Sequence, residues 1–168
     1  ALAIMVKGQP VKVRWSRAQE FYNTYQRQGV IARIKLGVKK DGTITAIEHT
    51  LHWDAGGYVE YGANVVNAVG LSATGPYRIP NVKIDSVCVY TNLPPSGPYR
   101  GFGYSEFHFG LESHITRIAQ KLGIDPVEFR KRNAIREGDT LAYGAKMNPC
   151  GMQEAIDRVA AEIGWGKK

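Results

Sequence analysis

The N-terminal half of the chain alternates apolar and polar side chains, a pattern typical of β-strands. Two alternating segments cover residues 31–38 and 43–53, and the Asp-Gly pair at 41–42 between them is a strong hairpin signal. A third segment, residues 82–90, predicts a half-buried strand. Residues 11–15 alternate apolar with basic side chains and predict one more short strand.

Two helical segments are predicted before the hairpin. Ser16 is a suitable N-cap for a helix over residues 17–25. Residues 1–8 have the pattern of the last turns of a helix that ends at Gly8, where glycine is the usual cap. We therefore expect the chain to be part of a longer polypeptide.

The longest predicted helix follows a loop rich in proline and glycine. Ser105 is its expected N-cap, and Gly123 is its expected C-cap. Its apolar positions form one stripe at helical spacing: Leu111, Ile115, Ile118 and Leu122.

Asp125 and Pro126 begin the next predicted helix, which ends at Asn133. A final amphipathic helix is expected over residues 152–163, before a short tail over residues 165–168. Strands come first and helices last. The sequence thus predicts one α+β domain over residues 1–168, with an antiparallel or mixed sheet that contains a long hairpin and packs against C-terminal helices.

The charge balance favours an anionic partner. The chain has 22 lysines and arginines against 15 aspartates and glutamates, a net charge of +7. Nucleic acid, a phosphorylated cofactor and an acidic protein surface would all fit this charge. The basic residues alternate along predicted strands or follow a helix, as on a solvated face, and no aromatic side chains are interleaved with them. We therefore expect no nucleic-acid partner.

Cysteine usage and hydropathy indicate the cellular compartment less directly. Cys88 and Cys150 are far apart and belong to no Cys-x-x-Cys motif, so neither a disulfide framework nor a zinc site is predicted. A reduced, cytoplasmic chain is the default expectation. No apolar segment is long enough to span a membrane, so no membrane partner is expected.

Most of the polar residues have an ordinary structural interpretation. His49 and His52 are three positions apart in a predicted strand, which places them on opposite faces and makes a poor metal site. Glu106 and Glu112 on the long helix are interpreted as solvated or capping charges. No hydrolase or nucleotide-binding motif is present in the sequence.

The exception is the loop of residues 98–103, with the sequence Pro-Tyr-Arg-Gly-Phe-Gly. Gly101 and Gly103 allow a sharp turn in which successive backbone N–H groups face one anion, beside the positive end of the next helix. Arg100 adds a planar guanidinium. Phe102, between two glycines, is expected to stay out of the core and to form a wall over a planar ligand. The alternative is a tight connection whose glycines only make the turn.

The same loop carries a family resemblance. The segments Thr91-Asn92-Leu93-Pro94 and Tyr99–Gly103, together with residues 118–126, closely resemble the molybdenum-cofactor-binding subunit of the xanthine dehydrogenase and aldehyde oxidoreductase family. Five more segments occur in the family's order: residues 10–17, the Asp41-Gly42 hairpin, residues 54–58 and 77–82, and Arg132-Asn133. The resemblance covers essentially the whole chain.

This resemblance implies a molybdenum hydroxylase. Such an enzyme holds molybdenum on a molybdopterin cofactor and oxidises an aldehyde or heteroaromatic carbon with oxygen from water. Electrons leave through iron–sulfur clusters to FAD or another acceptor on partner subunits or domains. By resemblance, Tyr99, Arg100, Gly101 and Gly103 are cofactor-binding, and Phe102 is substrate-binding.

The chain corresponds to only a middle portion of the family's large subunit. The family's upstream Gly-Gly-Gly-Phe-Gly-Gly motif and its downstream catalytic glutamate are absent from the sequence, so no catalytic residue and no metal ligand is assigned here. Residues 61–76 lack the arginine of purine-oxidising members, so a purine is a less expected substrate. Tyr104-Ser105-Glu106 replaces the more usual Gly-Pro-Gln.

Two functions are consistent with these residues. In the first, the chain is part of a molybdenum hydroxylase and is inactive alone, and its partners are the remainder of the subunit, iron–sulfur and flavin subunits and a small organic substrate. The alternative is a standalone module without redox chemistry, which binds a small anion at the helix start near Ser105 or interacts with another protein.

Overall fold

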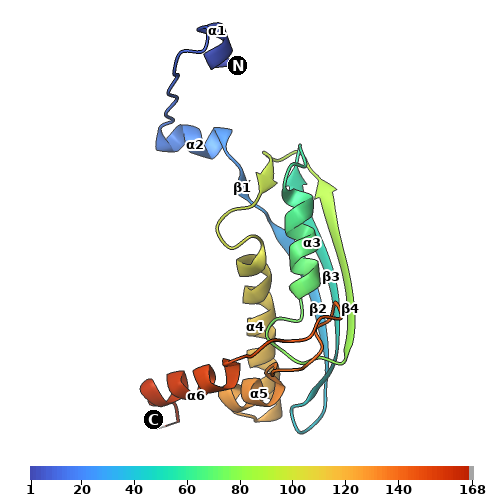
Figure 1. Cartoon of the computed structure of the whole chain (residues 1–168). Coiled ribbons are helices and arrows are strands. Elements are labelled where there is room, and N and C mark those ends of the chain that lie inside the picture. The colour runs from blue at the N-terminus through green and yellow to red at the C-terminus, as the bar shows by residue number, and fades with distance from the viewer. Residues whose placement is uncertain (167–168) are drawn as a thin grey trace.

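A computed structural model describes residues 1–166, so the last two residues of the expected tail lie outside the described chain. Its centre is a three-stranded sheet in the order β2 (Val30–Val38), β3 (Ile44–Gly56) and β4 (Asn81–Tyr90) (Figure 1). Strands β2 and β3 are antiparallel, whereas β3 and β4 are parallel. The predicted α+β class, the mixed sheet and the long hairpin are therefore confirmed.

Local hydrogen bonds build the turn between β2 and β3. The Gly42 N–H donates to the Lys39 carbonyl, and the Lys39 N–H donates to the Thr43 carbonyl, each at 2.9 Å. The Asp41 carboxylate accepts the Thr43 N–H at 2.9 Å, and this bond lowers the pKa of Asp41 below its usual value. All of these bonds lie within residues 39–43, which is why the Asp-Gly signal predicts this hairpin correctly.

The parallel pairing of β3 with β4 depends on a helix that the sequence pattern did not reveal. Parallel neighbours need a crossover connection, and here it contains α3 (Gly62–Ser72). Three valines of α3 are buried: Val65, Val66 and Val69. Valine and glycine are weak helix formers, so burial against the sheet, and not propensity, stabilises α3.

The C-terminal helices follow the prediction with one correction. They are α4 (Tyr104–Leu122), α5 (Pro126–Asn133) and α6 (Met152–Glu162). The Asp125 carboxylate accepts the N–H groups of residues 127 and 128 at 2.8 and 3.1 Å, as its capping role requires. Ser105, however, is not the N-cap of α4. That position is Gly103, in a left-handed conformation, and Ser105 lies inside the first turn.

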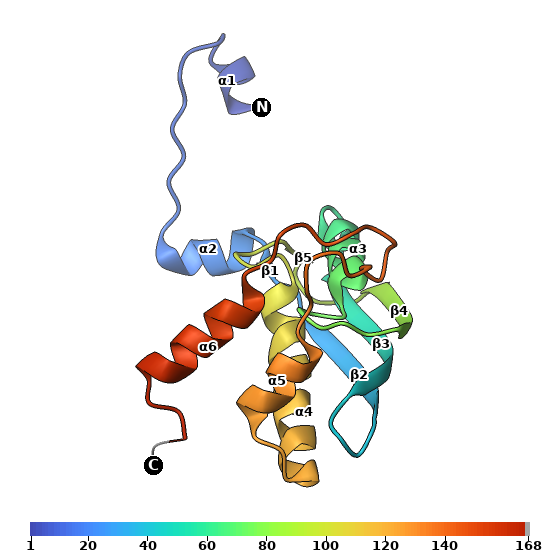
Figure 2. The same ribbon diagram turned by 60° about the horizontal axis from the view of Figure 1, so that its bottom comes forward.

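Helices α3 and α4 cover the same face of the sheet (Figures 1 and 2). Helix α3 contacts β3 and β4, and α4 contacts β2. The centre of the core is formed by fully buried side chains from β3, α3 and α4: Leu51, Trp53, Val65, Val69, Phe107 and Leu111. Ile118 and Leu122 of the predicted stripe lie nearer the helix end, and Leu122 is 37% exposed. The opposite sheet face carries a ladder of ion pairs, Lys35–Glu48 at 3.2 Å and Lys83–Asp85 at 3.5 Å.

Asn133, the last residue of α5, ties the helical layer to the hairpin. Its amide donates to the Gly42 carbonyl and to the Phe129 carbonyl, each at 2.8 Å, and accepts the Ile44 N–H at 2.8 Å. The side chain is buried, and these bonds satisfy three backbone groups. The end of α5 is thus fixed against the start of β3.

The N-terminal residues extend away from this body (Figures 1 and 2). Helices α1 (Leu2–Met5) and α2 (Arg17–Asn23) are joined by an extended segment, and Ser16 forms a capping box with Gln19. The predicted strand over residues 11–15 is wrong, because this segment is exposed and has no strand partner within residues 1–166. Within the same residues, every helix is too short or too polar to cross a bilayer.

A short parallel pair joins the N-terminal residues to the loop of residues 98–103. Strand β1 (Gln26–Arg27) pairs with β5 (Ser96–Gly97), and the Ser96 hydroxyl donates to the Asp54 carbonyl. The pair brings residue 27 next to the segment that leads into the Pro-Tyr-Arg-Gly-Phe-Gly loop.

His49 makes the stability of the chain depend on pH. It is fully buried in β3, its Nε2 lies 3.1 Å from the Ala73 carbonyl, and burial lowers its pKa from 6.5 to about 4. Between these two values the unfolded chain binds a proton at this position that the native chain does not. The contribution of His49 to the free energy of unfolding should therefore be greatest above pH 6.5 and fall by about 3 kcal/mol as the pH decreases to 4.

Denaturant unfolding at several pH values checks this prediction. His49→Leu should reduce the slope of unfolding free energy against pH, and the residual slope comes from His108 and His114, whose pKa values are also lowered by burial. His52→Leu, on the exposed face of the same strand, is the matched control and should keep the slope. Equal slopes for His49→Leu and the unmodified chain would contradict the assignment.

Candidate functional site

The loop of residues 98–103 is a compact turn with three successive residues in the left-handed region. Their φ values are 107° at Gly101, 49° at Phe102 and 86° at Gly103. The Phe102 N–H donates to the Tyr99 carbonyl and the Tyr104 N–H donates to the Gly101 carbonyl, each at 2.9 Å. The turn is therefore closed by its own backbone.

These bonds correct part of the sequence-based expectation. The N–H groups of Phe102 and Tyr104 are used inside the turn, so the amides do not form one uninterrupted row of donors. The N–H groups of Gly101 and Gly103 alternate with them and have no acceptor within residues 1–166. The turn keeps donors beside the N-terminus of α4, where the helix dipole favours an anion.

Gly103 allows the turn to lie directly against α3. A Cβ at this position would meet Cγ1 of Val65 at 2.6 Å and Cγ2 of Val69 at 2.8 Å. The ring of Trp53 would lie 3.4 Å from it. These neighbours belong to the fully buried core and have no free space to move into. Gly101 is constrained mainly by its φ of 107°, because the Ser105 hydroxyl that a Cβ would meet belongs to an exposed side chain that can rotate away.

Phe102 is not the free aromatic wall that the sequence predicts. Its ring is half-buried and packs against the hydrophobic core. A phenylalanine with positive φ is uncommon and costs about 1–2 kcal/mol, so the surrounding structure must hold it in place.

Tyr99 and Arg100 are the exposed members of the turn. The Tyr99 side chain is 61% exposed, and the Arg100 guanidinium has no carboxylate partner within residues 1–166. An unpaired guanidinium beside free backbone donors makes this end of α4 attractive to an anion.

Arg27 is part of the site although no sequence pattern indicates it. Its guanidinium donates to Glu106 Oε1 at 2.7 Å and to the Arg100 carbonyl at 2.9 Å, and it lies 4.9 Å from the centre of the Tyr99 ring. Arg27 and Glu106 are 79 positions apart. A local pattern cannot predict such a contact, because it depends on the pairing of β1 with β5.

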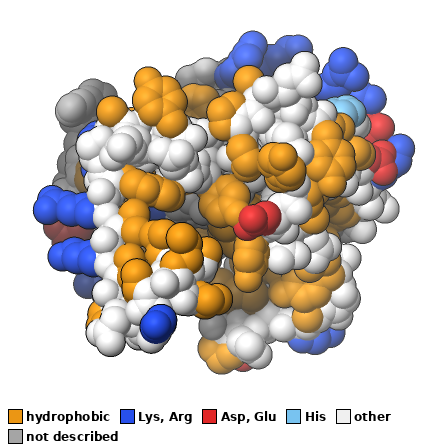
Figure 3. Space-filling view, turned by 90° about the horizontal axis from the view of Figure 1, so that it is seen from above, with side chains coloured by type: hydrophobic (Ala, Val, Ile, Leu, Met, Phe, Trp, Pro, Cys, Tyr) orange, Lys and Arg blue, Asp and Glu red, His pale blue; other side chains and the backbone are white. Residues whose placement is uncertain are grey.

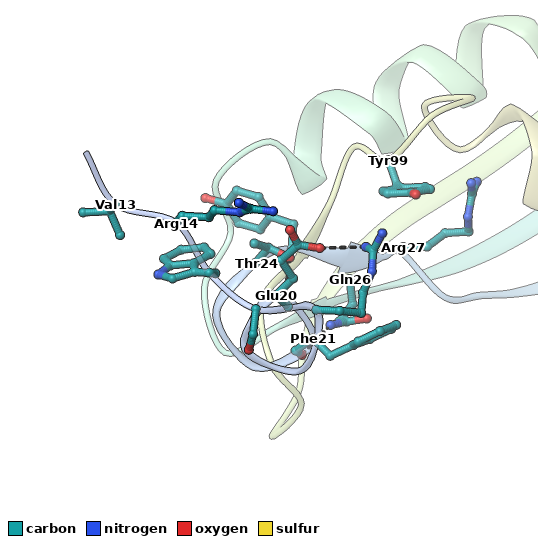
Figure 4. Close-up of a pocket in the computed structure, with 12 residues that line it drawn as sticks. Val13, Arg14, Glu20, Phe21, Thr24, Gln26, Arg27 and Tyr99 are labelled. Atoms are coloured by element: carbon teal, nitrogen blue, oxygen red, sulfur yellow. Dashed lines mark hydrogen bonds and ion pairs between the residues drawn. The ribbon is translucent and has the colours of Figure 1, made fainter. Parts of the chain in front are cut away.

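A hollow of 1210 Å³ borders the turn on the side of the N-terminal residues (Figure 4). Tyr99 and Arg27 form one side of it, and residues 13–17 and α2 form the other. Its lining mixes aromatic rings with cations. Figure 3, which looks onto this end of the molecule, shows apolar side chains spread over the surface.

The other candidate residues have structural roles. His49 is buried and His52 is exposed on the opposite face, as predicted from their spacing. Glu112 accepts the Tyr77 hydroxyl at 2.7 Å and pairs with Arg130 at 2.8 Å, so it is neither free nor an acid/base partner of Glu106. Burial raises the pKa of Tyr77. Within residues 1–166, no three metal-ligating side chains come together.

Comparison with known proteins identifies the family. Residues 1–134 match the sequence model of the molybdopterin cofactor-binding domain. The chain belongs to this family. The resemblance inferred from the motifs around Tyr99–Gly103 is thereby confirmed, and the alternative of an unrelated standalone module is not favoured.

Relatives of this domain are large molybdenum-binding subunits. The chain is 35% identical over 150 residues to the nicotinate dehydrogenase large molybdopterin subunit of Eubacterium barkeri, which covers 89% of the chain and 35% of the relative. It is 35% identical over 162 residues to the xanthine dehydrogenase molybdenum-binding subunit of Escherichia coli O157:H7, which covers 96% of the chain and 22% of the relative.

The fold is similar to that of a solved relative. The aldehyde oxidoreductase from Desulfovibrio gigas superposes with a TM-score of 0.88 at 32% identity, over 96% of this chain and 18% of that one. The chain therefore spans between 18% and 35% of the length of these three relatives.

Gly103→Ala should destabilise the chain strongly. The new methyl group is forced into the core side chains of α3, and alanine at this φ is strained, so we expect a loss of about 2–4 kcal/mol in the free energy of unfolding. Gly123→Ala is the matched control, since Gly123 has a φ of 67° and a Cβ there would have no other atom within 4 Å. It should lose only about 1 kcal/mol. Similar losses in a denaturant titration would show that close packing at Gly103 is unimportant.

Proposed function

We propose that this chain forms part of the cofactor and substrate site of a molybdenum hydroxylase. The observation that carries the proposal is the turn of residues 99–103, where an unpaired guanidinium and free backbone donors lie beside a helix N-terminus in a member of the molybdopterin cofactor-binding domain family. The domain over residues 1–168 would be one part of a larger subunit and inactive alone.

The residues of the turn fit an anionic cofactor. Arg100 is exposed and has no carboxylate within residues 1–166 to neutralise it, and the N–H groups of Gly101 and Gly103 lack acceptors there. Phosphate and other anionic groups are bound by this combination of donors and cation. When bound, the molybdopterin cofactor would supply the metal centre at which the substrate is oxidised. The residues of this chain would supply a positive charge and a binding surface that fits the cofactor.

Each residue of the turn has a proposed task. Arg100 would neutralise part of the cofactor's negative charge, and Gly101 and Gly103 would donate backbone hydrogen bonds. Tyr99 would border the cofactor on its exposed side. Phe102 would present the open part of its ring to a flat substrate, and the core packing of the rest of the ring would fix its orientation.

The substrate and partners are proposed by class. The substrate is an aldehyde or a heteroaromatic compound, and because residues 61–76 contain no arginine, a purine is disfavoured. The partners are the remainder of the molybdenum-binding subunit and iron–sulfur and flavin subunits or domains that carry electrons away. The assembly is proposed to be cytoplasmic.

Phe102→Ala in the full-length subunit should weaken substrate binding without loss of metal. The Michaelis constant for an aromatic substrate should rise about tenfold, because one face of the stacking surface is removed. Molybdenum content, measured by mass spectrometry of the metal, should stay unchanged. The control is Phe109→Ala, whose ring is 77% exposed on α4 and should have no effect on the Michaelis constant. An unaltered constant for Phe102→Ala would remove Phe102 from the substrate site.

Arg100→Gln should weaken cofactor binding and not substrate binding. Loss of the guanidinium removes a charge-assisted contact, so the purified full-length subunit should contain several-fold less molybdopterin and molybdenum. Arg117→Gln, an exposed arginine on α4, is the control and should retain both. An Arg100→Gln subunit with full cofactor content would contradict the cofactor assignment, and absence of molybdenum from the unmodified full-length subunit would overturn the proposed function.

A further inference from the structure

We propose that Arg27 is a positioning residue that holds the turn of residues 99–103 in its binding conformation. The proposal rests on the proposed function of that turn. It concerns a residue of strand β1, far from the turn in the sequence, which neither the loop sequence nor the family motif contains.

Arg27 contacts the turn and its surroundings at three independent places. One guanidinium nitrogen donates to Glu106 Oε1 at 2.7 Å, and the other donates to the Arg100 carbonyl at 2.9 Å. The same planar group lies 4.9 Å from the centre of the Tyr99 ring. Arg27 therefore contacts the Tyr99 ring at the start of the turn, the Arg100 backbone within the turn and Glu106 in helix α4. A single side chain therefore spans the whole turn.

The position of Arg27 is itself fixed. Strand β1 pairs in parallel with β5, which ends at Gly97, two residues before Tyr99. The neighbouring Gln28 is buried and its amide lies 3.5 Å from the Cys88 sulfur. The Arg27 backbone is thus anchored to the sheet end, and only its side chain reaches the turn. Such an anchored side chain can transmit the rigidity of the sheet to an exposed loop.

Loss of the Arg27–Glu106 ion pair would be destabilising because the Glu106 carboxylate is largely buried. Its side chain is only 13% exposed, and its Oε2 is buried without a hydrogen-bond partner within residues 1–166. Arg27 is thus the only cation paired with this carboxylate in the described chain. Removing Arg27 would leave a largely buried charge uncompensated, and the first turn of α4 would have to open to hydrate it.

The shape of the guanidinium matters as well as its charge. A lysine at position 27 could pair with Glu106, but its single ammonium group cannot donate in a fixed fork to Glu106 and the Arg100 carbonyl while also lying over the Tyr99 ring. Arg27→Lys should therefore preserve the charge compensation and still loosen the turn.

Proteolysis of the 168-residue chain provides a direct test, because trypsin cleaves after arginine and Arg100 lies within the turn. Under native conditions, the rate of cleavage between Arg100 and Gly101, followed by mass spectrometry, should rise about tenfold in Arg27→Gln and in Arg27→Lys. Arg33→Gln, an exposed arginine on β2 with no ion pair within residues 1–166, is the matched control and should be cleaved at the original rate.

A double variant separates positioning from stability. Arg27→Gln combined with Glu106→Gln removes the buried charge, so it should recover the midpoint of thermal unfolding. The turn should remain accessible to trypsin, because the contacts with the Arg100 carbonyl and the Tyr99 ring are still missing. If recovery of the unfolding midpoint also restores the original cleavage rate, Arg27 acts only through the ion pair and the proposal is overturned.

Kinetic measurements on the full-length subunit test whether the conformation of the turn affects substrate binding. Arg27→Gln with Glu106→Gln should raise the Michaelis constant several-fold, as Phe102→Ala does, with a smaller effect on kcat. An unchanged cleavage rate in Arg27→Gln, together with cofactor loss in Arg100→Gln, would overturn the positioning role and leave the proposed function intact. A loosened turn with no effect of Arg100→Gln or Phe102→Ala would overturn the proposed function instead.

Discussion

The close approach of the turn backbone to the buried face of α3 is the constraint on which the rest of the site depends. Gly103 lies where a methyl group would overlap Val65 and Val69, and it also begins α4. One residue without a side chain therefore joins the turn, the crossover helix and the longest helix. This contact holds the turn that precedes α4 against α3.

The turn stores strain that its surroundings hold in place. Phe102 has a left-handed backbone that a phenylalanine rarely adopts, and its half-buried ring packs against the core. Two backbone hydrogen bonds close the turn from within. Arg27 and Glu106 constrain it from outside. Strained backbone of this kind concentrates at functional sites, because a fixed shape there outweighs the conformational energy it costs.

The two ends of the molecule differ in the kinds of groups that they expose. At the hairpin end, Asn133 satisfies buried backbone groups of three segments, and the ion pairs on the outer sheet face are exposed to solvent. At the turn end, apolar side chains of the N-terminal residues and of the loops remain exposed. Figure 3 shows apolar side chains over this end of the surface. The closed end serves as a scaffold, and the open end carries the exposed residues proposed to meet the cofactor and the rest of the subunit.

Features specified by neighbouring residues could be predicted from the sequence. The Asp-Gly hairpin, the caps at Ser16 and Asp125 and the opposite orientation of His49 and His52 depend on contacts a few positions apart. The order of several short motifs along the chain, among them Thr91–Pro94 and Tyr99–Gly103, also sufficed to indicate the family, because such motifs are local in sequence and can be compared without a structure.

Contacts between distant segments required the tertiary structure. Helix α3 has weak intrinsic propensity and forms because its valines are buried by β3 and β4, whereas residues 11–15 have a strand pattern but no neighbouring strand within residues 1–166 to supply hydrogen bonds. The pairing of Arg27 with Glu106 and the half-burial of Phe102 depend on which segments meet in space. The sequence by itself determined the turns, caps and local patterns of each short segment. Only the tertiary structure decided which segments pack together, because strand hydrogen bonds and burial join residues that are far apart in the sequence.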